Sequence, residues 1–145
     1  MKLLDALFCD DIRHEASNKV SLMGLYNDRI VIHLDNSMEA KWPLPINLST
    51  LLRFSIEENE KQPVRFEFEY ILNEKTIVKI EGGVNLDNAN KVFTIALTGS
   101  GIPLEPGDLG FSIKIFHSNQ ICLTEMNKTA LKIIAMEIKE KRKLI

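Results

Sequence analysis

The stretch "VRFEFEYIL" (residues 64–72) is the feature that most restricts how this chain can fold. Apolar and charged side chains alternate along it: Val64, Phe66, Phe68 and Tyr70 against Arg65, Glu67 and Glu69. Successive side chains of a β-strand point to opposite faces of the sheet, so a period of two places the apolar set on one face. The stretch therefore predicts a strand with one buried face and one face in water.

Similar short segments recur up to about residue 126 and are separated by turn sequences. Beside 64–72, they are residues 3–10, 19–26, 28–34, 49–58, 76–86, 91–99, 109–116 and 121–126. Residues 38–47 contain Pro43 and Pro45, which cannot donate to a sheet ladder, so they predict an extended connection. Strands at this spacing without intervening helices predict an all-β fold, an antiparallel β-sandwich of the immunoglobulin/transthyretin-like class, with an open barrel as the alternative.

The last 19 residues, "NKTALKIIAMEIKEKRKLI" (127–145), break this pattern. Leu131, Ile134 and Ile138 fall at helical spacing, and lysines gather toward the end, where a helix dipole favours cations. A strand over "ALKIIAM" is the alternative, because the run is rich in isoleucine. The spacing favours a basic C-terminal helix, which divides the chain into a β-sandwich domain (1–126) and a helical extension (127–145).

Charge and composition exclude several classes of protein. Residues 1–127 hold 12 Lys/Arg against 18 Asp/Glu, whereas residues 128–145 hold six against two, so an acidic body precedes a basic tail. The net charge of −2 gives no overall attraction to nucleic acid or to acidic lipid, and no apolar run is long enough for a membrane span. The chain has two cysteines, and Asp5 interrupts the short apolar run at the N-terminus, which is therefore not expected to be a signal peptide. Both features predict a cytoplasmic protein with reduced thiols.

The segment "FCDDIRHE" (8–15) gathers a thiol, three carboxylates, a guanidinium and an imidazole. As a nucleophile, Cys9 would need His14 as its base, but the neighbouring carboxylates oppose a thiolate and His14 lies beyond the expected strand end. No catalytic residue is therefore predicted, and Cys9 is interpreted as a small buried hydrophobe.

Two other interpretations of the same segment stay open. Asp10, Asp11 and Glu15 carry the hard oxygen ligands that calcium prefers, and "NLDNAN" (85–90) is a second Asp/Asn-rich loop that could meet them. In the structural interpretation, which the sequence favours, the aspartates bond nearby backbone N–H groups and Arg13 binds one carboxylate with two parallel hydrogen bonds. No metal or cofactor is predicted on this basis.

Trp42 and the basic tail are the remaining candidates for contacts. Trp42, between Lys41 and Pro43, either caps the core from its rim, which is favoured, or anchors a partner or ligand. The tail either packs on the sandwich through its apolar side chains or pairs with a second copy, giving a homodimer. Contact with a membrane or with nucleic acid is the weakest alternative, because the tail has no aromatic residue.

Residues 6–28 resemble the N-terminal signature of a family of small bacterial proteins of unknown function. In that signature a Cys-Asp-Asp-x-Arg-x-Glu run precedes a Lys-x-Ser/Thr-Leu-x-Gly-x-Tyr strand. The matching positions are Cys9, Asp10, Asp11, Arg13, Glu15, Lys19, Ser21, Leu22, Gly24 and Tyr26. The resemblance implies a small β-sandwich and no particular activity.

These observations together predict a non-enzymatic β-sandwich module that acts through contacts with a protein partner or with a second copy of itself. Asp10, Asp11, Arg13, Glu15 and Trp42 are its candidate binding residues. The alternative is a calcium-type metal-binding domain or a hydrolase centred on the four charged residues of the N-terminal segment.

Overall fold

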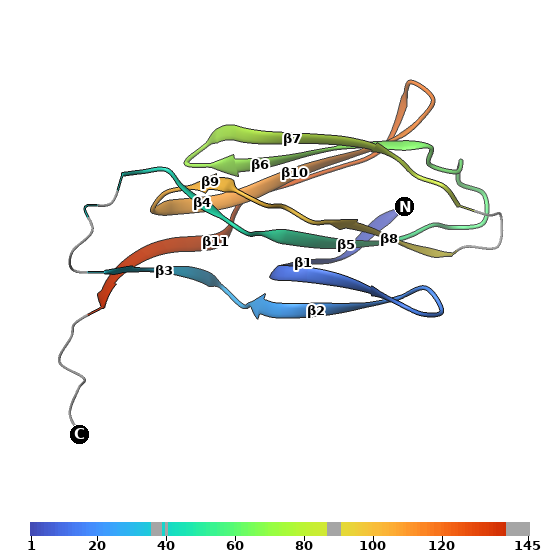
Figure 1. The fold of residues 1–145 in the computed structure, drawn as a ribbon. Helices are drawn as coiled ribbons and strands as arrows, with labels where there is room; N and C mark the ends of the chain where they lie inside the picture. The colour runs from blue at the N-terminus through green and yellow to red at the C-terminus, as the bar shows by residue number, and fades with distance from the viewer. Residues whose placement is uncertain (36–38, 40, 87–90, 139–145) are drawn as a thin grey trace.

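A computed structural model describes residues 1–35, 39, 41–86 and 91–138, and among these residues it contains only β-strands, connecting turns and loops (Figure 1). The four-stranded sheet has the order β2 (Lys19–Tyr26), β1 (Lys2–Glu15), β5 (Ser49–Ser55) and β8 (Val92–Leu97), all antiparallel. The five-stranded sheet has the order β3 (Arg29–Asp35), β11 (Gln120–Ile138), β10 (Gly107–His117), β6 (Arg65–Leu72) and β7 (Lys75–Gly83). In it β3 and β11 are parallel, whereas the other pairs are antiparallel. A small sheet pairs β4 (Leu44–Ile46) with β9 (Ile102–Leu104).

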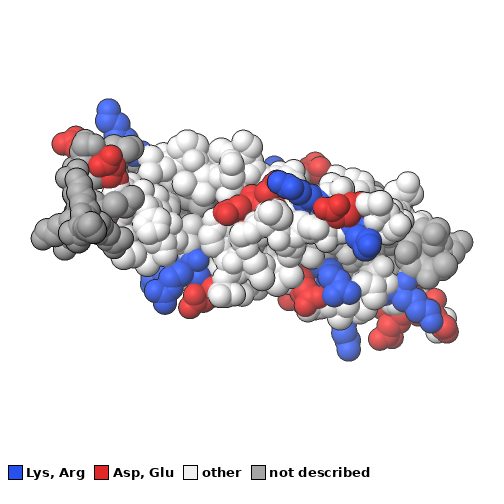
Figure 2. Space-filling model, turned by 60° about the horizontal axis from the view of Figure 1, so that its bottom comes forward, with Lys and Arg blue, Asp and Glu red and all other residues white. Residues whose placement is uncertain are grey.

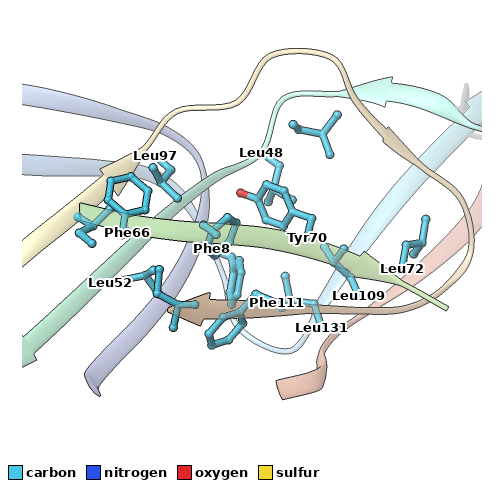
Figure 3. Close-up of a cluster of buried hydrophobic side chains, with 14 of the residues drawn as sticks. Phe8, Leu48, Leu52, Phe66, Tyr70, Leu72, Leu97, Leu109, Phe111 and Leu131 are labelled. Carbon is cyan, nitrogen blue, oxygen red and sulfur yellow. The ribbon is translucent and has the colours of Figure 1, made fainter. Parts of the chain in front are cut away.

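The two larger sheets share one apolar core (Figure 3). Phe8 of β1 meets Phe111 of β10 with ring centroids 5.8 Å apart, so the contact joins the two sheets. Thr50 of β5 and Tyr70 of β6 share a buried hydrogen bond between their hydroxyl groups, which leaves neither one unsatisfied in the core. The core side of β6 is the one that the alternation predicts: Phe66, Phe68 and Tyr70 are buried. The expected all-β class is therefore confirmed, while Val64 precedes β6 and is exposed.

The predicted C-terminal helix is wrong. Strand β11 continues without interruption from Gln120 to Ile138, and residues 139–145 of the predicted helix lie outside the described residues. The apolar residues of this run also satisfy a period of two, and Leu131 and Ile133 enter the core. Pairing with β10 and β3 decides between the two periods, because it supplies backbone partners and a buried face that a separate helix would not have. The predicted domain boundary at residues 126 and 127 falls inside this strand.

Candidate functional site

The candidate segment from Cys9 to Glu15 forms the second half of β1, and the two aspartates lie inside the strand and not at its end. Residues 8–15 pair with β2 in a hairpin whose turn residues Ser17 and Asn18 have φ of 63° and 57°. Two successive residues in the left-handed region match the twist of a tight hairpin, so β1 continues past the two aspartates. The predicted strand (residues 3–10) is therefore too short, since it ends at the first of the two aspartates, whereas the turn begins only at residue 16.

In the β1–β2 hairpin, the face of the sheet on which a given side chain of the alternating pattern lies changes at Asp10 and Gly24. On one side of this point Phe8 and Tyr26 contact the main core, whereas on the other side Ile12 and Leu22 contact a second cluster around Leu51. Phe8 and Ile12, like Leu22 and Tyr26, are four residues apart, and a regular strand would keep both members of such a pair on the same face. The exchange needs an irregular backbone, which Gly24 provides with a φ of 68°.

The Asp10 side chain contacts both Gly24 and Tyr26 at the point where the face changes. A Cβ on Gly24 would lie 2.2 Å from its Oδ2, so the carboxylate occupies the space that the glycine leaves open. The Tyr26 hydroxyl donates a hydrogen bond to Oδ1 of Asp10. Burial, followed by this hydrogen bond, raises the pKa of Tyr26, so the phenol stays protonated and remains a donor across the physiological range. This contact replaces the expected capture of a carboxylate by Arg13.

Cys9 is buried, and it is not hydrogen-bonded to His14, the base that a nucleophilic cysteine would need. Its Sγ donates to the carbonyl of Asp11 over 3.3 Å, while His14 is exposed and lies opposite Val20 of β2. Burial, and next the Asp10 carboxylate, raises the pKa of the thiol. The thiol form therefore dominates near neutral pH, and the group has the surroundings of a packing residue.

Asp10 and Asp11 line a hollow of about 680 Å³ beside the start of β5 and the end of β8. Asn47, Ser49 and the segment Thr98–Ser100 contribute further amide, hydroxyl and backbone groups to its wall. The Ser49 hydroxyl donates to the carbonyl of Asp10 over 3.4 Å, which fixes β1 against β5 at this point. Two carboxylates among neutral hydrogen-bonding groups can bind a cation or a hydroxyl-rich ligand.

The structure separates the other predicted site residues from this hollow. Arg13 and Glu15 lie further along the hairpin and are exposed, and neither forms an ion pair with another described residue. No group of three histidine, cysteine, aspartate or glutamate side chains within the described residues is placed to hold a metal ion. Residues 87–90 of the second Asp/Asn-rich loop lie outside the described part of the chain. Trp42 is half-buried and packs against the main core, as expected for a residue that caps its rim.

A second concave surface, the β1/β11 groove, was missed by sequence analysis. It has a volume of about 350 Å³ and lies between the first half of β1 and the middle of β11. Its lining consists of Leu3, Ala6, Leu7, Phe8, Tyr26, Asn27, Phe111, Glu125, Met126, Asn127 and Ala130. No signal in the sequence pointed to it, because it exists only where residues 125–130 form a strand beside β1.

Charged side chains of both signs are interspersed over the face seen in Figure 2, with uncharged surface between them. This face therefore has no broad basic patch of the kind that binds a nucleic-acid backbone. Within the described residues there is also no helix with the length and hydrophobicity needed to cross a bilayer.

Comparisons with known proteins give no relative from which a function can be transferred. No protein-family model matches the chain, and no curated protein matches it either. The inference of function therefore depends on the hollow, the groove and the exposed surface.

Proposed function

We propose that this protein is a non-enzymatic, cytoplasmic module with an immunoglobulin/transthyretin-like β-sandwich, and that it acts through protein contacts. Kinship with the bacterial family that residues 6–28 resemble is part of the same proposal. Among the described residues, nine large hydrophobic side chains are exposed, and seven of them belong to β1, β2 and β11: Leu4, Val20, Met23, Leu25, Ile121, Met126 and Met136. Burial of such side chains against a partner is favourable because it removes apolar surface from water. Their concentration on three strands therefore supports a protein interface there.

Photo-crosslinking in the producing cells tests this proposal. Benzoylphenylalanine at Leu25, which is 50% exposed on β2, is expected to form adducts with one protein of defined mass. The matched control is Thr94, an exposed residue on β8 in the same sheet, which is expected to form none. Equal labelling from both positions, or no adduct from Leu25, contradicts a protein-binding role for this surface.

Self-association through the C-terminal segment is one form of the proposal. Removal of residues 128–145 does not test it cleanly, because Leu131 and Ile133 belong to the core and the shortened chain would lose them. Met136 is 50% exposed on the part of β11 that pairs with β3, so Met136→Asp adds a charge without removing a core residue. Light scattering is expected to give the mass of two chains for the parent protein and of one chain for the variant. A single-chain mass for the parent protein contradicts the homodimer.

The hollow at Asp10 and Asp11 favours a second candidate, a calcium-type site or a metal-dependent hydrolase. Its two carboxylates and surrounding hydroxyl groups are the observation that supports it. Calcium or magnesium chloride is then expected to raise the melting temperature, since a ligand that binds only the folded state stabilises it. Asp11→Asn should abolish the rise and Asp28→Asn, on the exposed β2–β3 connection, should not. No rise with either salt contradicts this candidate.

A further inference from the structure

We infer that the β1/β11 groove binds an extended peptide strand of a partner protein, with apolar side chains at alternate positions and a lysine or arginine facing Glu125. The inference rests on the proposed function and specifies its site and the chemistry of the partner. The groove is bordered by two strand edges, has an apolar floor, and carries a single charged group on its wall.

Both borders of the groove are strand edges without a neighbour. Strand β1 pairs with β5 from Lys2 onward, but its pairing with β2 begins only at Phe8. Strand β11 pairs with β10 from Gln120 onward, but its pairing with β3 begins only at Lys132. On both strands, the described residues before these points therefore present one edge of backbone N–H and C=O groups without a strand partner. Such an edge is a template for an added strand.

The floor of the groove is apolar and partly formed by small side chains. The Phe8 and Phe111 rings lie at its base, and Ala6 and Ala130 leave room above them. Met126 is 53% exposed at the rim and can fold over an occupant, since its unbranched side chain adapts to different shapes. An occupant with alternating apolar residues would place every second side chain on this floor while the intervening ones face water.

One end of the groove lies at the crossing from β2 to β3, and the open edge of β1 defines its length. Tyr26 and Asn27 line it where the chain crosses from one large sheet to the other, and the amide of Lys132 donates to the carbonyl of Asp28 over 2.9 Å beside this crossing. In Figure 1, β1 enters this region from the N-terminus and β11 from its hairpin with β10. The open edge of β1, from residue 2 to residue 7, is about 20 Å long at the rise of a β-strand, which suits a peptide of about six residues.

Charge determines which peptide fits. Among the described residues that line the groove, Glu125 is the only charged one, and it forms no ion pair with another described residue. A cation opposite Glu125 would be attracted to it, whereas an acidic residue there would be repelled. Residues 1–127 also carry 12 Lys/Arg against 18 Asp/Glu, so the body of the protein favours a basic partner at longer range.

Selection from a displayed library of random nonapeptides on the full-length protein tests the inference. Enriched peptides should alternate apolar and polar residues and share a lysine or arginine at one position. Met126→Asp should weaken binding of a synthesised selected peptide at least tenfold, whereas Val92→Asp, at an exposed residue of β8 outside the groove, should leave it unchanged. Glu125→Lys should shift the selected residue to aspartate or glutamate. N-methylation of alternate amides along one edge of the selected peptide should abolish binding, because it removes the N–H groups that would hydrogen-bond to the strand edge.

Several outcomes overturn the inference. They are a selection without enrichment, selected peptides that bind Met126→Asp as well as the parent protein, and a charge preference that Glu125→Lys does not alter. Light scattering gives a further test. If the parent protein has the mass of two chains and only Met126→Asp reduces it to one, the groove binds a second copy of the chain, and the inference is overturned. If selection fails while Leu25 still crosslinks to one protein, the protein-binding role stands and the groove assignment fails. If both fail, neither proposal stands.

Discussion

The two longest strands, β1 and β11, both change neighbours part-way along, but they do so with different devices. Strand β1 keeps an unbroken register with β2, and Gly24 and the Asp10 side chain accommodate the change of face. In β11, Leu131 pairs with Leu109 and Asn127 with Phe111, so four steps along β11 match two along β10. This is a β-bulge with two extra residues, which bends the strand and increases its twist.

The difference is one of rigidity. In β1, the atoms closest to a Cβ added at Gly24 belong to the Asp10 side chain, which can rotate away. At the bulge in β11, the backbone of Asn127 and Lys128 lies directly on Gly110, and the amide of Thr129 is held by Oδ1 of Asn127 over 3.0 Å. Backbone that packs on backbone cannot move without breaking hydrogen bonds between β10 and β11. Substitutions at the bulge should therefore lower the free energy of unfolding more than substitutions at Gly24.

Gly110→Ala is expected to have the largest effect. Its Cβ would lie 2.1 Å from the carbonyl oxygen of Asn127 and 2.4 Å from Cα of Lys128, which forces the bulge away from β10. We expect the free energy of unfolding to fall by about 3 kcal/mol in urea denaturation. Gly83→Ala is the control, because its Cβ would come no closer than 3.9 Å to the Val64 carbonyl oxygen. Equal effects at both glycines would show that the bulge is not rigid.

Alkaline pH probes the core between the two large sheets, where Tyr70 of β6 is hydrogen-bonded to Thr50 of β5. Burial raises the pKa of Tyr70 from 10.0 to about 12, despite the opposing hydrogen bond with Thr50. Because the unfolded chain loses this proton first, the stability is complete below pH 10 and is lost as the pH rises toward 12, by about 2 kcal/mol at pH 12. Tyr70→Phe should start lower by about 1 kcal/mol at neutral pH but show a flatter decline. A decline as steep as that of the parent protein would assign the pH dependence to other groups.

Gly24→Ala should have a smaller effect than Gly110→Ala. Alanine at a φ of 68° costs about 1–2 kcal/mol, and the new methyl group must also displace the Asp10 carboxylate from Tyr26. We expect a total loss of about 2 kcal/mol by urea denaturation. In an Asp10→Ala background only the backbone cost remains, so the two substitutions should be less than additive. Full additivity would mean that the carboxylate does not fill the space over Gly24.

Arg13→Ala is expected to have the smallest effect, less than about 0.5 kcal/mol, because the side chain is exposed and pairs with no described residue. Arg53→Ala is the comparison on the neighbouring strand, since Arg53 binds Asp5 over 2.9 Å. A loss above about 1 kcal/mol for Arg13→Ala would restore the sequence-based interpretation, in which this guanidinium holds an aspartate.

Part of the candidate site could be anticipated from the sequence. Consecutive aspartates next to an apolar strand identified Asp10 and Asp11, and these two do line a hollow together. Their partners could not be anticipated, because Ser49, at the start of β5, and Thr98, just after β8, are far away in the chain. Arg13 and Glu15 seemed to belong with the aspartates only because they are close in sequence, and the extended hairpin carries them away.

The sequence by itself determined the all-β class of the fold and the buried face of β6. Alternation along Phe66, Phe68 and Tyr70 depends only on neighbouring residues, and it correctly predicted which side chains are buried. Only the tertiary structure decided that residues 127–138 form a strand, because the apolar spacing there fits a helix and a strand alike. The choice depends on backbone partners in β10 and β3, and pairing over such distances leaves no local trace in the chain. The β1/β11 groove follows from that choice, so it too was decided by tertiary structure.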